Sequence, residues 1–146
     1  MGKVISRKTL TPKELLRLAS PVLFCSSWQF YKTIIEDSGF QTISLNLPLA
    51  KALIGKSEKE IIASITDIIL GLLPKQNPIY LSDYETLFDP RYRLDVIKLF
   101  CEIARHNKLF IQWCGGLING FLTYAEHGYT DYAKYKVSDY EITCIV

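Results

Sequence analysis

Short, uninterrupted apolar runs alternate along the chain with longer segments in which apolar residues recur every three or four positions. The apolar runs at Val22–Cys25 and Leu109–Trp113 predict strands buried on both faces. Further strands are predicted at Phe40–Leu45, at Ile79–Asp83, which ends in an acid, and at Tyr140–Val146, which closes the chain. The recurring pattern predicts helices between them, at about Tyr31–Ser38, Leu49–Ile54, Ser57–Leu72 and Leu94–His106. Because strands alternate with helices, we expect an α/β fold, a three-layer sandwich whose sheet is mainly parallel.

Local signals place the ends of several predicted helices. Thr11–Glu14 has the residue types of an N-cap, a first-turn proline and an acidic third position, which predicts one further helix. Ser57–Glu60 forms a capping box before the longest helix, while Gly39 and Gly55 are placed to end the helices that precede them. The tyrosine-rich stretch Tyr124–Tyr140 carries no regular pattern, so we expect it to be irregular.

Composition agrees with a folded globular protein. Of the 146 residues, 49% are hydrophobic and 22% charged, and without a linker or repeat we expect a single domain over residues 1–146. The net charge of +2 gives no indication of nucleic acid or an acidic membrane surface as a partner. The short basic stretches Ser6–Lys8 and Lys56–Lys59 are typical of solvated surface.

The cysteine and histidine pattern indicates no metal site. The four cysteines are widely spaced and the two histidines are isolated, so the cysteines are expected to be free thiols in a reducing compartment. The N-terminus has no apolar leader and no apolar run approaches the length of a membrane span. The expected location is therefore cytoplasmic.

One segment, Ser26-Ser27-Trp28-Gln29-Phe30-Tyr31-Lys32-Thr33, lies between a predicted strand and a predicted helix, the context of a phosphate-binding G-x-x-x-x-G-K-[ST] loop. The Lys-Thr pair is intact, but Ser26 and Tyr31 stand at the two glycine positions. Those glycines let the backbone curl around phosphates with its N–H groups inward, which side chains obstruct. The predicted nucleotide-binding residues of this degenerate loop are Ser26, Ser27, Tyr31, Lys32 and Thr33; an ordinary helix start is the alternative.

Candidate chemistry gathers after the predicted strands, whose carboxyl ends share the edge of a parallel sheet where ligands bind. Asp83 ends the third predicted strand in the position of a Walker-B acid and, with the Thr33 hydroxyl, would hold Mg²⁺. Lys32 would neutralise the β- and γ-phosphates. Glu85 would polarise the attacking water, as the catalytic residue, or pair with another subunit. The alternatives are a helix or turn cap for Asp83 and a surface carboxylate for Glu85.

Four sequence blocks resemble one protein family. Ile79–Asp89, I-Y-L-S-D-Y-E-T-L-F-D, is similar to the L-L-D-x-x-E-x-L-F-D block of the small P-loop protein of BREX phage-defence systems, the BrxF family. The other blocks agree in order and spacing: Asn46–Ala50 with its N-x-x-L segment, Ala104–Asn107 followed by Gln112–Gly115 with its S-R-N-R and W-N-G segments, and Leu122–Gly128 with its L-T-Y-A-E-P-G-H segment. The similarity covers the chain from about Ser20 to its C-terminus.

This resemblance implies a minimal RecA/AAA-like P-loop NTPase fold and a role in a multi-protein system that restricts phage. The chain departs from the family at the loop glycines and at Cys114, which stands where an Asn suited to sense the γ-phosphate is expected. His127 and Tyr129 also replace a Pro and a His. The loop and Cys114 departures imply weakened or lost hydrolysis, with ATP and Mg²⁺ bound weakly or not at all.

Two functions follow from these residues. The first is an NTPase-like subunit that acts through assembly with other defence proteins, and the alternative is an active ATPase using Lys32, Thr33, Asp83 and Glu85. A Ser or Cys hydrolase lacks its G-x-S-x-G signature.

Aromatic residues of the C-terminal part form the candidate partner face, chiefly Tyr124, Tyr129 and Tyr132, with Tyr135 and Tyr140 nearby. Packing on a sheet edge is the alternative for each tyrosine, and the mixed charge around them favours a protein partner over DNA. Arg105 is a candidate arginine finger across a homo-oligomer interface or, alternatively, complements its helix dipole.

Overall fold

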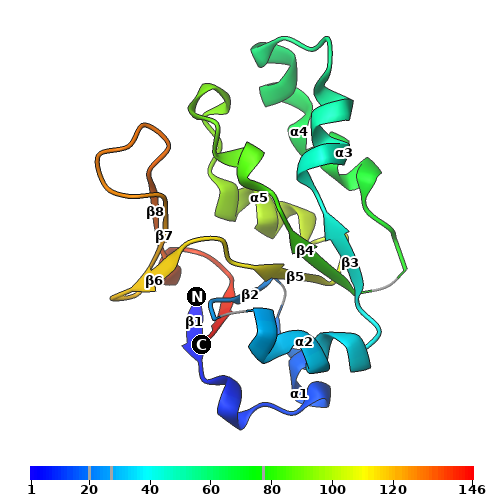
Figure 1. Cartoon of the computed structure of the whole chain (residues 1–146), viewed down its shortest axis with the longest axis vertical. Helices are drawn as coiled ribbons and strands as arrows, with labels where there is room; N and C mark the ends of the chain where they lie inside the picture. Colours follow the sequence, from blue (N-terminus) through cyan, green and yellow to red (C-terminus); the bar gives the residue numbers. More distant parts are fainter. Residues whose placement is uncertain (20, 27, 77) are drawn as a thin grey trace.

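The computed structural model describes residues 1–19, 21–26, 28–76 and 78–146, with the side chains of Thr9, Pro12, Trp28–Tyr31 and Ile34 also outside the description. Figure 1 shows a central sheet between two layers of helices, with a smaller sheet projecting to one side. The main sheet has six strands in the order β1-β9-β2-β5-β4-β3, all parallel. Its strands are β1 (Lys3–Ile5), β2 (Val22–Phe24), β3 (Gln41–Ser44), β4 (Ile79–Ser82), β5 (Leu109–Gln112) and β9 (Thr143–Ile145). The predicted α/β fold with a parallel sheet is confirmed.

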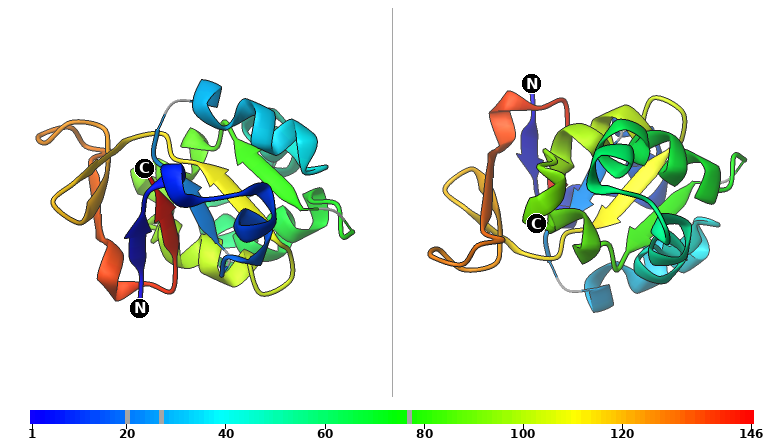
Figure 2. Two further views of the ribbon diagram at one scale, coloured as in Figure 1. Left: turned by 90° about the horizontal axis from the view of Figure 1, so that it is seen from below. Right: turned by 90° about the horizontal axis from the view of Figure 1, so that it is seen from above.

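Helices cover both faces of the main sheet (Figures 1 and 2). On one face lie α1 (Pro12–Arg17) and α2 (Trp28–Asp37), and on the other α3 (Asn46–Leu53), α4 (Glu58–Leu72) and α5 (Val96–Ile103). Short 3₁₀ helices lie in the connections: η1 (Arg7–Thr9), η2 (Glu85–Phe88), η3 (Pro90–Tyr92) and η4 (Val137–Asp139). Within the described residues, no helix is both long and apolar enough to cross a membrane.

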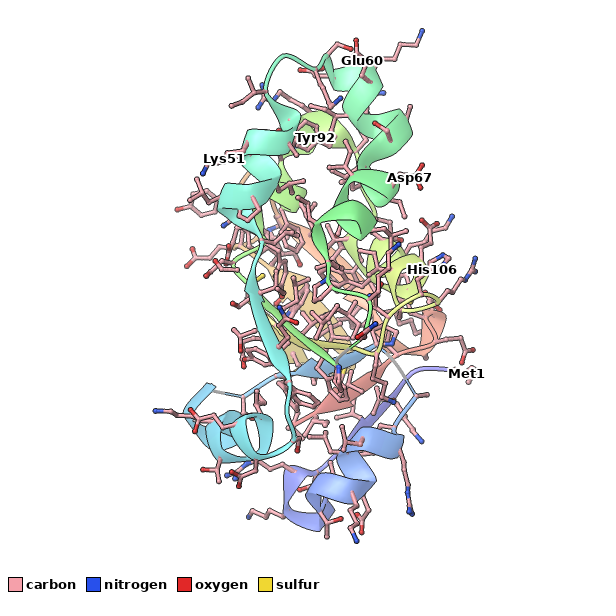
Figure 3. All side chains as sticks on the ribbon, turned by 90° about the vertical axis from the view of Figure 1, so that its right-hand side faces the viewer. Met1, Lys51, Glu60, Asp67, Tyr92 and His106 are labelled. Carbon is pink, nitrogen blue, oxygen red and sulfur yellow. The ribbon has the colours of Figure 1, made fainter. Side chains whose placement is uncertain are left out.

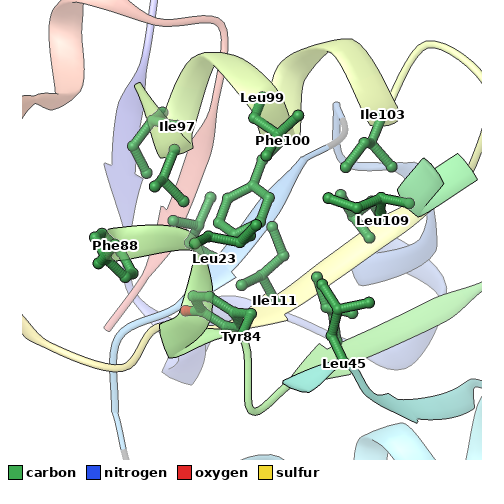
Figure 4. Packing of buried hydrophobic residues seen from close by; sticks show 14 of the residues in the cluster. Leu23, Leu45, Tyr84, Phe88, Ile97, Leu99, Phe100, Ile103, Leu109 and Ile111 are labelled. Atoms are coloured by element: carbon green, nitrogen blue, oxygen red, sulfur yellow. The ribbon is translucent and has the colours of Figure 1, made fainter. Parts of the chain in front are cut away.

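The central strands supply both hydrophobic layers. On β2, Leu23 packs toward α3–α5, while its neighbours Val22 and Phe24 pack toward α1 and α2, and all three are 0% exposed. The strand β5 alternates in the same way. Figure 4 shows the larger layer, in which the Phe100 ring of α5 meets Tyr84 edge-on with 5.1 Å between ring centroids. This burial on both faces explains why the apolar runs of these strands are uninterrupted.

Helix ends follow the capping signals with two exceptions. The hydroxyl of Thr11 accepts a hydrogen bond from the Glu14 N–H at 3.2 Å, and that of Ser57 accepts one from the Glu60 N–H at 3.2 Å. The helix α3 begins at Asn46 rather than Leu49, since the proline at position 48 is tolerated in a first turn. The helix α2 begins at Trp28, so the prediction of a start near Tyr31 is wrong.

The expectation of an irregular Tyr124–Tyr140 segment holds for residues 125–132 but is wrong for Tyr124 and for Ala133–Lys136, which belong to an antiparallel second sheet. This sheet consists of β6 (Gly116–Ile118), β7 (Phe121–Tyr124) and β8 (Ala133–Lys136). Asn119 and Gly120 link β6 to β7 with φ of +52° and +80°, as a type I′ hairpin turn requires. The Asn-Gly pair is a strong sequence signal for this hairpin, although its short, half-exposed strands carry little apolar pattern.

The connection from β5 to the second sheet depends on a close backbone approach at Gly115. A Cβ atom built there would lie 1.7 Å from the carbonyl oxygen of Thr123 on β7. Only glycine fits this position without moving the second sheet away from β5.

We expect Gly115→Ala to lower the free energy of unfolding by at least about 2 kcal/mol, because the added methyl group overlaps backbone. As the control, Gly71→Ala in α4 meets no atom within 4 Å and should raise stability by about 0.5–1 kcal/mol. Urea unfolding followed by circular dichroism measures both. Equal midpoints for the two variants would contradict this account of Gly115.

Candidate functional site

The ends of β2 and β5 form the point where the chain leaves the main sheet toward opposite faces. After β2 the chain enters α2 on one face, whereas after β5 it enters the second sheet, whose Leu122 and Tyr135 belong to the layer of α5. The two strands are neighbours, with Phe24 opposite Gln112. Ligands of open α/β sheets bind in the crevice that such a divergence creates. The candidate site therefore lies at this edge, where the sequence predicts it.

The side chain of Gln112 links the three neighbouring strands β2, β5 and β4. Its Nε2 donates to the carbonyl oxygens of Ser26 at 2.7 Å and Phe24 at 3.3 Å, and its Oε1 accepts from the Tyr80 hydroxyl at 2.7 Å. The backbone N–H of Trp113 also donates to the Phe24 carbonyl at 2.9 Å. The chain leaving β2 is thus hydrogen-bonded to the end of β5 by the protein's own amide.

Next to this link, Tyr84 connects the end of β4 to the end of β5. Its side chain is 0% exposed, its hydroxyl donates to the Gln112 carbonyl at 2.6 Å, and the same oxygen accepts from the Cys114 N–H at 3.1 Å. Burial, followed by the nearby Cys114, raises the Tyr84 pKa well above its ordinary value. Burial also raises the Cys114 pKa to about 11, so this thiol is protonated at neutral pH.

The predicted nucleotide-binding residues divide between the turn and α2. Ser26 is half-buried before the helix, and Lys32 and Thr33 are exposed in the second turn of α2. Ser27 and the Tyr31 side chain lie outside the described residues, although the Tyr31 backbone is helical. Strand β2 ends at Phe24 and α2 starts at Trp28, so only three residues separate the two elements.

The two predicted carboxylates both contact residues at the β3 side of β4. Asp83 adopts φ of +50°, a left-handed conformation that Asp tolerates, and its Oδ2 accepts from the Ser44 hydroxyl at 2.7 Å. Glu85 Oε2 accepts from the Asn46 amide at 2.9 Å. Strand β3 lies three positions from β2, roughly 14 Å at the usual strand spacing. The Asp83 carboxylate thus bonds at the β3 edge of the sheet, whereas the turn that precedes Lys32 and Thr33 follows β2.

Asn46 joins α3 to the loop after β4 through both ends of its amide. Besides the bond to Glu85, its Oδ1 accepts from the Thr86 N–H at 3.1 Å and hydroxyl at 2.9 Å. Its own N–H donates to the Asp83 carbonyl at 2.6 Å. These bonds fix the conformation of the segment that carries Asp83 and Glu85.

Neither the four surface hollows described below nor a metal-ligand group coincides with the predicted site in the described part of the chain. Four surface hollows of about 290 to 460 Å³ are described, and none of these four is lined by Ser26, Lys32, Thr33, Asp83 or Glu85. Across residues 1–19, 21–26, 28–76 and 78–146, no three His, Cys, Asp or Glu side chains gather as a metal site. The Thr33 and Asp83 metal ligands stay a prediction.

The three tyrosines of the candidate partner face differ in exposure, since Tyr124 and Tyr132 are half-buried. Tyr124 stacks on Phe88 with centroids 3.8 Å apart, and Tyr132 meets the His127 ring edge-on at 5.3 Å. Tyr129, by contrast, is 64% exposed. Arg105, in the connection that precedes β5, lies at the amino edge of the sheet, opposite the candidate site.

Sequence reasoning did not assign roles to the three residues with the most side-chain hydrogen bonds at this edge, Gln112, Asn46 and Tyr84. Gln112 is the polar residue that ends the apolar strand β5, and Asn46 is the polar residue at the start of α3, two positions after β3 ends, so a polar residue at a strand end or helix start is the available signal. Tyr84 stands between two acids, and only the fold shows that its ring points inward.

Comparisons of the chain with protein-family models, with curated proteins and with solved structures give no significant match.

We expect Asn46→Ala to lower the free energy of unfolding by about 2–3 kcal/mol, because it leaves the Thr86 N–H and hydroxyl without their acceptor. Ser44→Ala, which removes one exposed hydrogen bond to Asp83, is the control and should change stability by about 0.5 kcal/mol or less. Chemical denaturation measures both. Similar losses for the two variants would show that Asn46 does not anchor this loop.

Proposed function

We propose that this protein is a P-loop NTPase-like subunit of a BREX-type phage-defence complex, which acts through protein assembly and has weakened or lost nucleotide hydrolysis. The sequence blocks that resemble the BrxF family suggest the system. We further propose that the main sheet is a minimal RecA/AAA-like fold, which its all-parallel strands and central β2 support. The observation that carries the loss of hydrolysis is the early start of α2.

A phosphate-binding loop needs several non-helical residues whose N–H groups surround the phosphates. Here residues 28–31 form the first turn of α2, so the exposed Lys32 side chain lies beyond the turn that follows β2. The N–H groups of a first helical turn can meet one phosphate group, which supports weak rather than tight binding.

The hydrogen bonds at the site support the same proposal. Gln112 bonds to the Ser26 carbonyl, while Asp83 and Glu85 bond to Ser44 and Asn46. A nucleotide would have to replace these bonds with its own. Cys114, a neutral thiol at the end of β5, is a weak hydrogen-bonding partner for a γ-phosphate.

The active ATPase is the second candidate, and one observation favours it. Strand β2, which leads to Lys32, is central and diverges from β5 at the crevice where ligands of such sheets bind, with Asp83 and Glu85 at the same edge. For this function the first turn of α2 would have to unwind around the phosphates and Asp83 would have to leave Ser44.

We expect ATP with Mg²⁺ to bind with a dissociation constant weaker than about 100 µM, because no preformed loop surrounds the phosphates. Lys32→Ala should change this value less than about twofold, as should the control Lys51→Ala on α3. Titration calorimetry or a fluorescent ATP analogue measures the three proteins. Micromolar binding that Lys32→Ala abolishes would instead support the active ATPase.

Assembly can be tested at the exposed tyrosine of the second sheet. Tyr129→Ala should weaken binding to the other defence proteins roughly 30-fold, the effect of losing about 2 kcal/mol at an aromatic anchor. Co-purification and a plaque assay measure complex formation and defence. Ile54→Ala, at a 79% exposed position directly after α3, is the control and should leave both intact, as should Lys32→Ala. Full activity of Tyr129→Ala with loss in Lys32→Ala would contradict the proposal.

A further inference from the structure

The small net charge of the chain conceals an uneven distribution. Residues 1–19 contain five lysine and arginine residues and one acid, a net charge of +4. The remaining residues contain twelve basic and fourteen acidic residues, a net charge of −2. The basic residues of this N-terminal part are Lys3, Arg7, Lys8, Lys13 and Arg17.

The fold places this N-terminal part on the outside of the molecule as one continuous border. Strand β1 is an edge strand of the main sheet, and η1 and α1 follow it onto the outer face. Figures 1 and 3 show η1 and α1 at the end of the molecule remote from α4. Lys3, Lys8, Lys13 and Arg17 are exposed there, and we call these four residues the basic strip.

The two ion pairs that the structure describes, Met1 with Glu141 and Arg91 with Asp89, leave the basic strip out. Lys13 and Arg17 stand four residues apart on α1, so both project from one side with about 6 Å of helix rise between them. The exposed acids on α1 and the adjoining α2 are Glu14, Glu36 and Asp37.

From this placement we infer that the basic strip binds the phosphate backbone of double-stranded nucleic acid, without reading its sequence. Lysine and arginine side chains that contact the phosphates of a duplex neutralise their charge and release the counterions bound to it. This contact is separate from the nucleotide site and adds a partner that the whole-chain charge gave no reason to expect.

The composition of the strip favours a duplex over other polyanions. Residues 1–19 contain no aromatic residue, so they offer no surface on which the bases of a single strand stack. The helix α1 has six residues, and the exposed large apolar side chains of this part are Met1, Val4 and Leu16, which is little for insertion into a membrane surface.

The test is fluorescence anisotropy with a labelled DNA duplex of mixed sequence, titrated with the full chain at several salt concentrations. Four phosphate contacts predict that affinity falls roughly a hundredfold between 50 and 200 mM salt. The triple variant Lys8→Ala, Lys13→Ala and Arg17→Ala should lose most of that dependence, down to roughly fourfold. The control carries Lys51→Ala, Lys56→Ala and Lys59→Ala, with the same change in net charge on exposed positions of the α3–α4 end, and should behave as wild type.

Three results would overturn the inference: no duplex binding by the wild type at 50 mM salt, equal weakening by the two triple variants, or tighter binding to a single strand or to phosphatidylserine vesicles than to the duplex. Thermal melts verify that both variants are folded. If only the triple variant of the basic strip binds the duplex more weakly than wild type, the inference is supported, whatever affinity the protein has for ATP.

Discussion

Burial of the central strands on both faces is the constraint from which the rest of the arrangement follows. Val22, Leu23 and Phe24 are completely buried although successive side chains of a strand point to opposite faces. Helices must therefore cover both faces, and the right-handed connections of parallel strands send α2 to one side and α3–α5 to the other. The divergence of the chain after β2 and β5 follows directly. The location of the candidate site thus follows from hydrophobic burial alone and does not depend on the polar residues that lie there.

The polar side chains at that edge satisfy one another. Gln112, Tyr84 and Asn46 each make at least two side-chain hydrogen bonds between neighbouring segments. Buried polar groups need partners, and a site built for a ligand leaves some of its groups free to bind that ligand. Here the bonds are made within the chain, which stabilises the fold and raises the cost of admitting a nucleotide. The physical argument for a degenerate site therefore rests on these bonds as well as on the missing loop glycines.

The sequence predicts the strands of the core and the parallel sheet because a strand that is buried on both faces has a continuous run of apolar residues, as at Val22–Phe24. It predicts Asp83 and Glu85 at the correct edge but not their partners, since Ser44 and Asn46 lie far away in the sequence. The start of α2 was missed because the similarity to a phosphate-binding loop outweighed local helix propensity. Edge strand β1 and the second sheet were missed because short, half-exposed strands carry little apolar pattern.

The end of β5 connects the candidate site to the surface proposed for assembly. Gln112 bonds to the turn after β2, the adjacent Trp113 donates from its indole N–H to the Gly116 carbonyl at 3.0 Å, and Gly115 touches β7. The Trp113 ring also meets Phe88 and Tyr135 edge-on, so the second sheet is held against the body by the residues that follow Gln112 directly. In the proposed function, the carboxyl edge of the main sheet supports the partner-binding surface through this connection, and that role requires no nucleotide turnover. It anchors the second sheet, whose strands β7 and β8 are joined by the loop with Tyr129, against the core, and a pre-ordered surface loses less entropy on binding a partner.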